Sequence, residues 1–125
     1  MPTSDTELAQ MRRTLEQKAA RRARELEGRL GEARRDFQKI VRHITETYRP
    51  VRIRQWGSLI DGAHFWERSD IDIAVEGISS AEVFFAMLRD AEGMTGFPVD
   101  LVQMETIHRA FAESIRERGR IVYDR

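Results

Sequence analysis

Ser69-Asp70-Ile71-Asp72-Ile73-Ala74-Val75 is the most informative segment of the sequence, because two carboxylates alternate in it with apolar residues. Side chains two residues apart on a β-strand point to the same face, so Asp70 and Asp72 are expected side by side. Two carboxylates about 7 Å apart along one strand repel each other unless a cation lies between them. The segment therefore predicts a strand over residues 71–75 that begins at a divalent-cation site. Hard oxygen ligands favour Mg²⁺ or Mn²⁺ at such a site.

A third carboxylate lies in the later segment Val99-Asp100-Leu101-Val102, which is otherwise apolar. Aspartate is rare in strands and costly to bury without a partner. If this strand pairs with the one over residues 71–75, Asp100 faces the same metal ions. Three carboxylates around two metal ions are typical of in-line phosphoryl displacement, in which one ion activates the attacking oxygen and the other stabilises the leaving oxygen.

A Gly-Ser pair follows the first expected strand, residues 51–56, in which apolar and polar residues alternate. Gly57 allows the backbone to approach a phosphate closely, and the Ser58 hydroxyl and amide can donate hydrogen bonds to it. Together with Ser69, these two residues form the expected nucleotide-binding set. Arg52 and Arg54 of the same strand are expected on a solvated face, with contact to phosphates as the alternative.

The remainder of the chain alternates between helices and strands. Further strands are predicted over residues 99–102 and 121–123, and helices over residues 81–92 and 107–118. This alternation indicates an α/β (α+β) fold in which helices pack on a sheet.

Residues 5–48 contain no proline and are rich in residues that favour helices. Apolar residues recur every three or four positions, which places them in one stripe along a helix. Gly28 and Gly31 predict a bend or break, so residues 1–31 are interpreted as a helical extension and residues 32–125 as the core. Partner packing or self-association as a homo-oligomer is the expected use of the extension. The stripe consists of Leu8, Met11, Leu15, Ala19, Ala23, Leu26, Leu30, Ala33, Phe37, Ile40, Ile44 and Tyr48.

Composition excludes several classes of protein. Cysteine is absent, which excludes disulfides, thiolate zinc sites and cysteine nucleophiles. No apolar run approaches the roughly 20 residues of a membrane span, and no signal peptide is seen, so a cytoplasmic protein without membrane contact is expected. Residues 1–50 carry twelve Lys or Arg against eight Asp or Glu, whereas residues 51–125 carry nine against thirteen. The basic half suits an acidic partner, although a solvated helix face is the simpler interpretation, and nucleic acid is not expected as a partner.

Taken together, the Gly-Ser pair, the Asp-x-Asp segment and the third carboxylate resemble the minimal nucleotidyltransferases of the DNA polymerase β superfamily. The resemblance covers about residues 32–125. It implies a polymerase β-like nucleotidyltransferase core with a small mixed sheet packed by helices, here preceded by a long N-terminal helix.

The resemblance also implies roles for these residues. Asp70 and Asp72 would bind both Mg²⁺ ions, with Asp100 as the third catalytic and metal-binding carboxylate. Gly57 and Ser58 would contact the β- and γ-phosphates of ATP. Many small prokaryotic members are antitoxins paired with a helical ribonuclease toxin of the HEPN type, which they inactivate by adding AMP to a tyrosine. The chain is therefore expected to be a Mg²⁺-dependent protein adenylyltransferase.

Two departures from the family pattern concern the loop after the Gly-Ser pair. Eleven residues separate Ser58 from Asp70, where the family typically has ten. The basic residue that often follows the Gly-Ser pair is missing, and His64 and Arg68 are the candidates to replace it. His64 also belongs to an aromatic cluster with Phe65 and Trp66, which is expected to form a hydrophobic lid or to stack on a base.

Two alternatives to the adenylyltransferase remain. One is a non-catalytic antitoxin that neutralises its toxin by binding alone, for which the long stripe on the N-terminal helix provides a surface. The other is a nucleotidyltransferase for a small molecule such as an aminoglycoside, which ranks lower because a chain of 125 residues has no obvious second domain to form the acceptor pocket.

Overall fold

The computed structural model describes residues 4–62, 65–66 and 68–125, and it contains every helix and strand that the sequence predicts. The last helix begins at Arg109 rather than at Ile107, because the His108 side chain accepts a hydrogen bond from the Ala110 backbone N–H and so caps the helix. In chain order the elements are α1 (Asp5–Tyr48), β1 (Arg52–Trp56), β2 (Ile71–Glu76), α2 (Ala81–Gly93), β3 (Val99–Gln103), α3 (Arg109–Arg118) and β4 (Arg120–Asp124).

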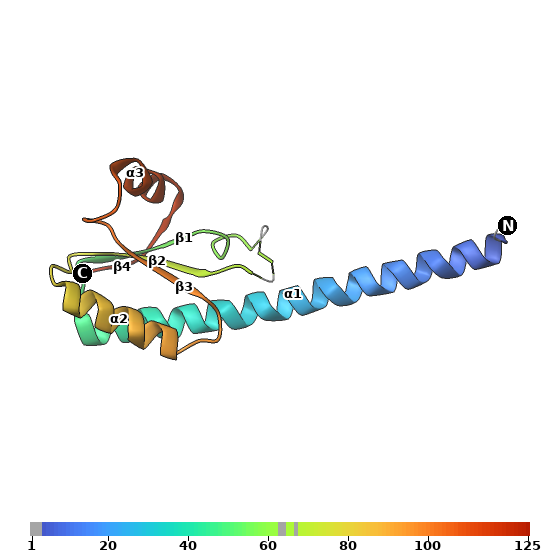
Figure 1. Cartoon of the computed structure of the whole chain (residues 1–125), viewed down its shortest axis with the longest axis horizontal. Coiled ribbons are helices and arrows are strands. Elements are labelled where there is room, and N and C mark those ends of the chain that lie inside the picture. Colours follow the sequence, from blue (N-terminus) through green and yellow to red (C-terminus); the bar gives the residue numbers. More distant parts are fainter. Residues whose placement is uncertain (1–3, 63–64, 67) are drawn as a thin grey trace.

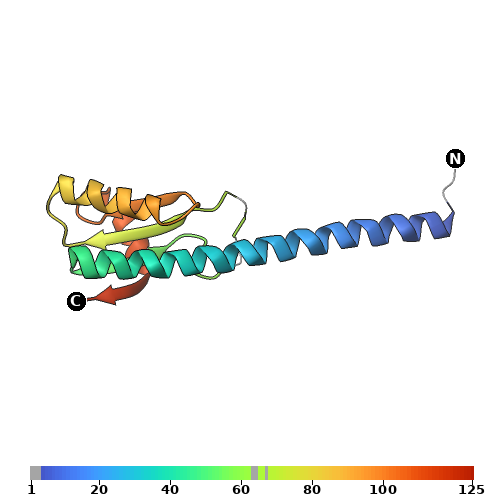
Figure 2. The same cartoon turned by 90° about the horizontal axis from the view of Figure 1, so that it is seen from below.

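The four strands form one mixed sheet in the order β3-β2-β1-β4. Strand β1 is antiparallel to both β2 and β4, whereas β2 and β3 are parallel. Helices α1 and α2 cover one face of the sheet and α3 lies on the other, as Figure 1 shows. In the turned view of Figure 2, α1 and α2 lie beside each other across the covered face. The mixed sheet packed by helices confirms the predicted fold class.

The main hydrophobic core lies between the sheet and the α1–α2 layer. The apolar positions of β2 face these helices, as their alternation predicts. On α2, the predicted apolar face built around Met87 packs against the same cluster, and Ser80 caps the helix by accepting a hydrogen bond from the Val83 N–H. The largest fully buried side chains include Ile40, Ile44, Ile53, Leu59, Ile71, Ile73, Val75 and Met87.

Helix α1 is continuous over 44 residues, so the predicted break near Gly28 and Gly31 is wrong. A glycine inside a helix costs only about 1 kcal/mol relative to alanine, whereas a break would leave several backbone groups without partners. Strong helix formers surround both glycines, and the buried side chains of α1 begin at Ala33. At the start of the helix, the Ser4 hydroxyl accepts a hydrogen bond from the Glu7 N–H. None of the described helices has the length and apolar character to cross a membrane.

The expectation of a solvated face for the arginines of β1 is wrong for Arg54, which is 7% exposed. Its guanidinium donates to a Glu76 carboxylate oxygen at 2.9 Å, and Arg52 contacts the same carboxylate at 3.4 Å. The cross-strand ion pair lowers the cost of burying the arginine under α3. It also holds Glu76 at the opposite end of β2 from Asp72.

Candidate active site

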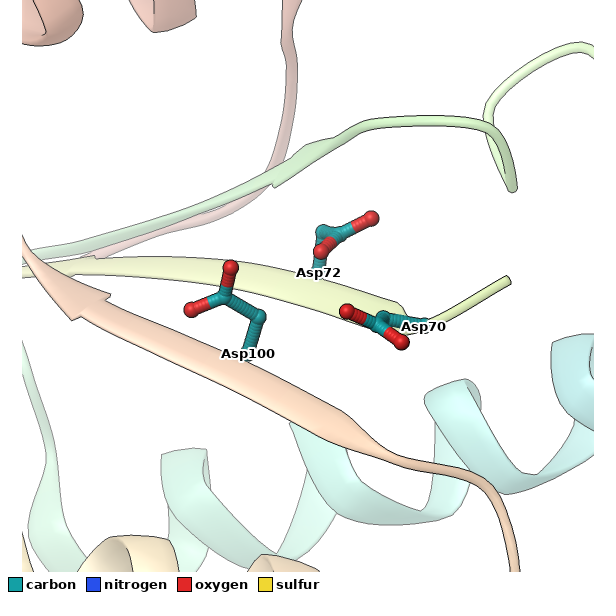
Figure 3. Close-up of side chains that lie close together, drawn as sticks. All are labelled: Asp70, Asp72 and Asp100. Atoms are coloured by element: carbon teal, nitrogen blue, oxygen red, sulfur yellow. The ribbon is translucent and has the colours of Figure 1, made fainter. Parts of the chain in front are cut away.

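Two neighbouring parallel strands bring three carboxylates together. Asp72 of β2 lies directly opposite Asp100 of β3 in the sheet register, and Asp70 immediately precedes β2. Each of the three side chains has an oxygen within 4.8 Å of the other two. Figure 3 shows the three carboxylates converging on the same space beside the strands. The pairing of β2 with β3, on which the predicted site depended, is therefore present.

The electrostatics of this cluster favour a bound cation. Asp72 is only 7% exposed, and burial together with the charges of Asp100 and Asp70 raises its pKa to about 7. Burial and the charge of Asp70 raise the pKa of Asp100 as well. Three anionic oxygen ligands this close together suit a hard divalent ion, which would remove the repulsion between them. The donor set therefore fits Mg²⁺ or Mn²⁺.

The raised pKa of Asp72 predicts that the metal-free protein loses stability as the pH rises. Folding favours the protonated form, so the stabilisation is complete below the unfolded-state pKa near 4 and is lost as the pH passes about 7. Between pH 5 and pH 8 we expect the free energy of unfolding to fall by roughly 2–3 kcal/mol because of this group. Urea denaturation in the presence of a chelator measures the change.

The matched control is Asp72→Asn, which cannot ionise. The variant should lose most of this pH dependence and should be more stable than the wild type at pH 8. An equal pH dependence in the two proteins would show that Asp72 is not the group responsible.

Gly57 lies against Asp72, and the absence of a side chain at Gly57 leaves room for the Asp72 carboxylate. The backbone φ at Gly57 is +80°, a conformation that other residues rarely adopt. A β-carbon at this position would lie 2.0 Å from Oδ2 of Asp72. Glycine is therefore required here for two independent reasons, conformation and space.

A cavity of about 530 Å³ opens beside Gly57 and extends between the end of β1 and α3. This volume is within the range of small-molecule sites. The indole N–H of Trp56 is buried and has no hydrogen-bond partner among the described residues, although other atoms of this residue line the cavity. The cavity is lined by Trp56, Gly57, Ser58, Ile60, Asp61, Phe111, Ser114, Ile115 and Arg118.

The other residues predicted to contact the nucleotide do not all line the cavity. Ser58 lines the cavity, whereas Ser69 is buried and its hydroxyl accepts a hydrogen bond from the Trp66 N–H at 3.0 Å. This hydrogen bond of Ser69 therefore stabilises the loop directly before Asp70. Arg68 is exposed, and His64 lies outside the described residues. Ser69 as a nucleotide contact stays a prediction.

The two described members of the aromatic cluster, Phe65 and Trp66, differ in exposure. Phe65 is buried and contacts Phe97 edge to face, with the ring centroids 6.4 Å apart. The neighbouring Trp66 is 54% exposed. Phe65 therefore belongs to the core, and Trp66 is the one of these two that solvent reaches, whereas His64 lies outside the described residues.

The α3 side of the cavity was missed by the sequence analysis. Phe111, Ser114, Ile115 and Arg118 line it, and their spacing of three, four and seven residues places them on one helix face. The Phe111 ring packs edge to face on Trp56 at 5.2 Å. The sequence pattern of this face is that of an ordinary core-packing helix face. Only the position of α3 beside the Gly-Ser pair shows that the face lines a cavity.

Comparison with known proteins decides the family. The family described as "Polymerase beta, Nucleotidyltransferase" matches residues 38–125, which include all three carboxylates and the Gly-Ser pair. The chain belongs to this nucleotidyltransferase family. The resemblance inferred from the sequence motifs is thereby confirmed. No curated protein sequence matches the chain significantly.

Solved structures share the fold of this nucleotidyltransferase. One is described as a toxin–antitoxin with AMP-PNP; it is 20% identical, covers 71% of this chain and 73% of its own, and gives a TM-score of 0.61. Another is the toxin–antitoxin MntA-HepT, which is 17% identical, covers 74% of this chain and 73% of its own, and gives a TM-score of 0.57. At these identities the likeness establishes the fold.

Proposed function

We propose that the chain is an antitoxin that transfers AMP from ATP to a hydroxyl group, most specifically a tyrosine of a HEPN-type toxin, with two Mg²⁺ ions. The observation that carries the proposal is the cluster of Asp70, Asp72 and Asp100, in which one oxygen of each carboxylate lies within 4.8 Å of one oxygen of each of the others. The adjoining cavity is large enough for a nucleotide. The similarity to toxin–antitoxin structures, one of them with AMP-PNP, supports the choice of partner and nucleotide.

Each residue has a defined task in the proposed reaction. Asp70, Asp72 and Asp100 would hold the metal ions, which supply positive charge to the attacking oxygen and to the leaving phosphate. Ser58 donates hydrogen bonds to the outer phosphates, and the absence of a side chain at Gly57 lets them approach the strand. The acceptor hydroxyl forms a bond to the α-phosphorus, the bond from that phosphorus to pyrophosphate breaks, and Asp100, the most exposed carboxylate, accepts the hydroxyl proton.

Arg118 is the candidate for the basic residue that the loop after Gly57-Ser58 lacks, because it lines the same cavity as Ser58. A charge-assisted hydrogen bond to phosphate contributes about 1.5–3 kcal/mol, so Arg118→Ala should raise the KM for ATP about tenfold or more. The matched control is Arg116→Ala, which removes the same charge from an exposed position of α3 outside the cavity lining. Equal KM values for the two variants would show that Arg118 does not contribute to ATP binding.

The test of the proposed function separates covalent inactivation from binding. The toxin is incubated with this chain, ATP and Mg²⁺, the chain is then removed, and the ribonuclease activity of the toxin is measured. Inactivation that persists after removal, and that Asp70→Asn abolishes, supports AMP transfer. Activity that returns on removal, with neutralisation unaffected by Asp70→Asn, supports an antitoxin that acts by binding alone.

A further inference from the structure

The N-terminal half of α1 carries an apolar stripe that nothing in the described chain covers. Leu8, Met11 and Leu15 are 50%, 58% and 65% exposed, respectively. The stripe continues through Ala19, Ala23 and Leu26 into the residues that pack on the sheet. Its average spacing matches the roughly 3.6 residues of a helical turn, so the stripe stays on one side of the helix throughout. The exposed apolar residues therefore face the same side as the sheet.

The helix leaves the body of the protein beside the candidate active site. Leu30 packs on the loop between β1 and β2, where a β-carbon at Gly62 would lie 2.7 Å from a Leu30 methyl group. A guanidinium nitrogen of Arg34 contacts the Leu59 carbonyl oxygen of the same loop at 3.5 Å. In Figure 1 this loop lies at the end of the sheet from which α1 projects. The carboxylates lie on the opposite face of the sheet, toward α3, but near the same end, so a protein seated on the exposed stripe would adjoin the end of the sheet that carries them.

The charge around the stripe argues against a second copy of this chain as its occupant. Residues 11–24 contain six Lys or Arg and one Glu. Pairing this segment with the same segment of a second copy would bring two net charges of +5 together, because each copy has six cations and one anion there. Like charges juxtaposed across an interface are destabilising, so a helix pair of two copies is disfavoured.

We infer that the stripe from Leu8 to Leu26, with its basic flanks, is the docking surface for the protein that carries the acceptor hydroxyl. This inference rests on the proposed function and adds the surface that recognises the substrate. The partner surface is an apolar helical groove with acidic edges, because an apolar helix face fits such a groove and the cations of residues 11–24 require anions opposite them. The stripe spans roughly 27 Å of helix at a rise of 1.5 Å per residue, enough to orient a partner beside the catalytic site.

The test compares two double substitutions with equal change of charge in the full-length chain. Met11→Glu/Leu15→Glu places carboxylates in the stripe, whereas Gln10→Glu/Gln17→Glu places them on the opposite side of the helix. Glutamate favours helices, so α1 is expected to stay formed in both variants. The probe is the same HEPN-type toxin that the test of the proposed function uses, and its affinity is measured by calorimetry.

The stripe variant should bind the toxin at least about 100-fold more weakly than the wild type, because two apolar side chains of about 1.5 kcal/mol or more each are lost from the interface. It should raise the KM for toxin in the AMP transfer reaction and leave kcat at saturating toxin unchanged. The opposite-face variant should differ from the wild type by less than about threefold, and added salt should weaken binding of the wild type.

Equal affinities of the two variants would overturn the docking surface while leaving the AMP transfer intact. Wild-type chain that self-associates through the stripe, and becomes monomeric in Met11→Glu/Leu15→Glu, would make a second copy the occupant and would also overturn it. Failure of the wild type to bind the toxin would overturn both this inference and the proposed function.

Discussion

Asp72→Asn should reduce the rate of nucleotide transfer by at least about 1,000-fold. The substitution removes one carboxylate of the cluster and with it part of the charge that would hold a divalent ion. Loss of such a group is expected to cost about 4 kcal/mol or more in the transition state, which corresponds to this factor. The same substitution should stabilise the metal-free protein above pH 7, because the pKa of the buried Asp72 carboxyl is raised to about 7. Activity and stability should therefore change in opposite directions. Initial rates with labelled ATP and denaturation curves measure the two effects.

The control for this prediction is Glu113→Gln, which removes one carboxylate from an exposed position of α3, where it pairs with Arg109. Because exposed ion pairs contribute little to stability, the rate and the free energy of unfolding of Glu113→Gln should stay close to those of the wild type. A variant Asp72→Asn that retains more than a tenth of the wild-type rate would contradict a catalytic metal site at this cluster.

Gly57→Ala should have the second largest effect. A methyl group at this position would lie 2.0 Å from Oδ2 of Asp72 and would require a backbone φ of +80°. The side chain of Asp72 must then rotate away or the end of β1 must shift, and misplacement of a catalytic group by about 1 Å can cost 100-fold in rate. We expect a loss of at least about 100-fold in kcat, and a weakened affinity for Mn²⁺ by calorimetry.

The matched control is Gly28→Ala on α1, where a β-carbon would meet nothing within 4 Å. Alanine is favoured over glycine inside a helix by about 0.5–1 kcal/mol, so this variant should be slightly more stable and fully active. Normal activity of Gly57→Ala would contradict the proposed dependence of activity on the close packing of Gly57 against Asp72.

The carboxylate cluster could be predicted because it depends on local rules. The two-residue period of a strand places Asp70 and Asp72 on one face, and an aspartate in an apolar strand signals that Asp100 has a special environment. The pairing of β2 with β3 was an added assumption, which the parallel register of Asp72 with Asp100 confirms.

The errors of the sequence analysis have two sources, an overestimated local cost of glycine in α1 and tertiary contacts elsewhere. The two glycines of α1 predicted a break, yet the helix continues because their cost is small against that of unpaired backbone groups. Arg54 was expected in solvent, but α3 and the ion pair with Glu76 bury it. The Arg118 side of the cavity could not be anticipated, since nothing local to α3 shows that it lies across from Gly57-Ser58.

The most direct measurement of the central claim uses ATP labelled on either the α- or the γ-phosphate. The wild-type chain, Mg²⁺ and the HEPN-type toxin are incubated with each form, and the label on the toxin is counted with its intact mass. AMP transfer predicts α-label on the toxin with the mass of one or more AMP units, no γ-label, and loss of the α-label in Asp70→Asn. Toxin that is neutralised while carrying neither label, or that carries the γ-label, would contradict it.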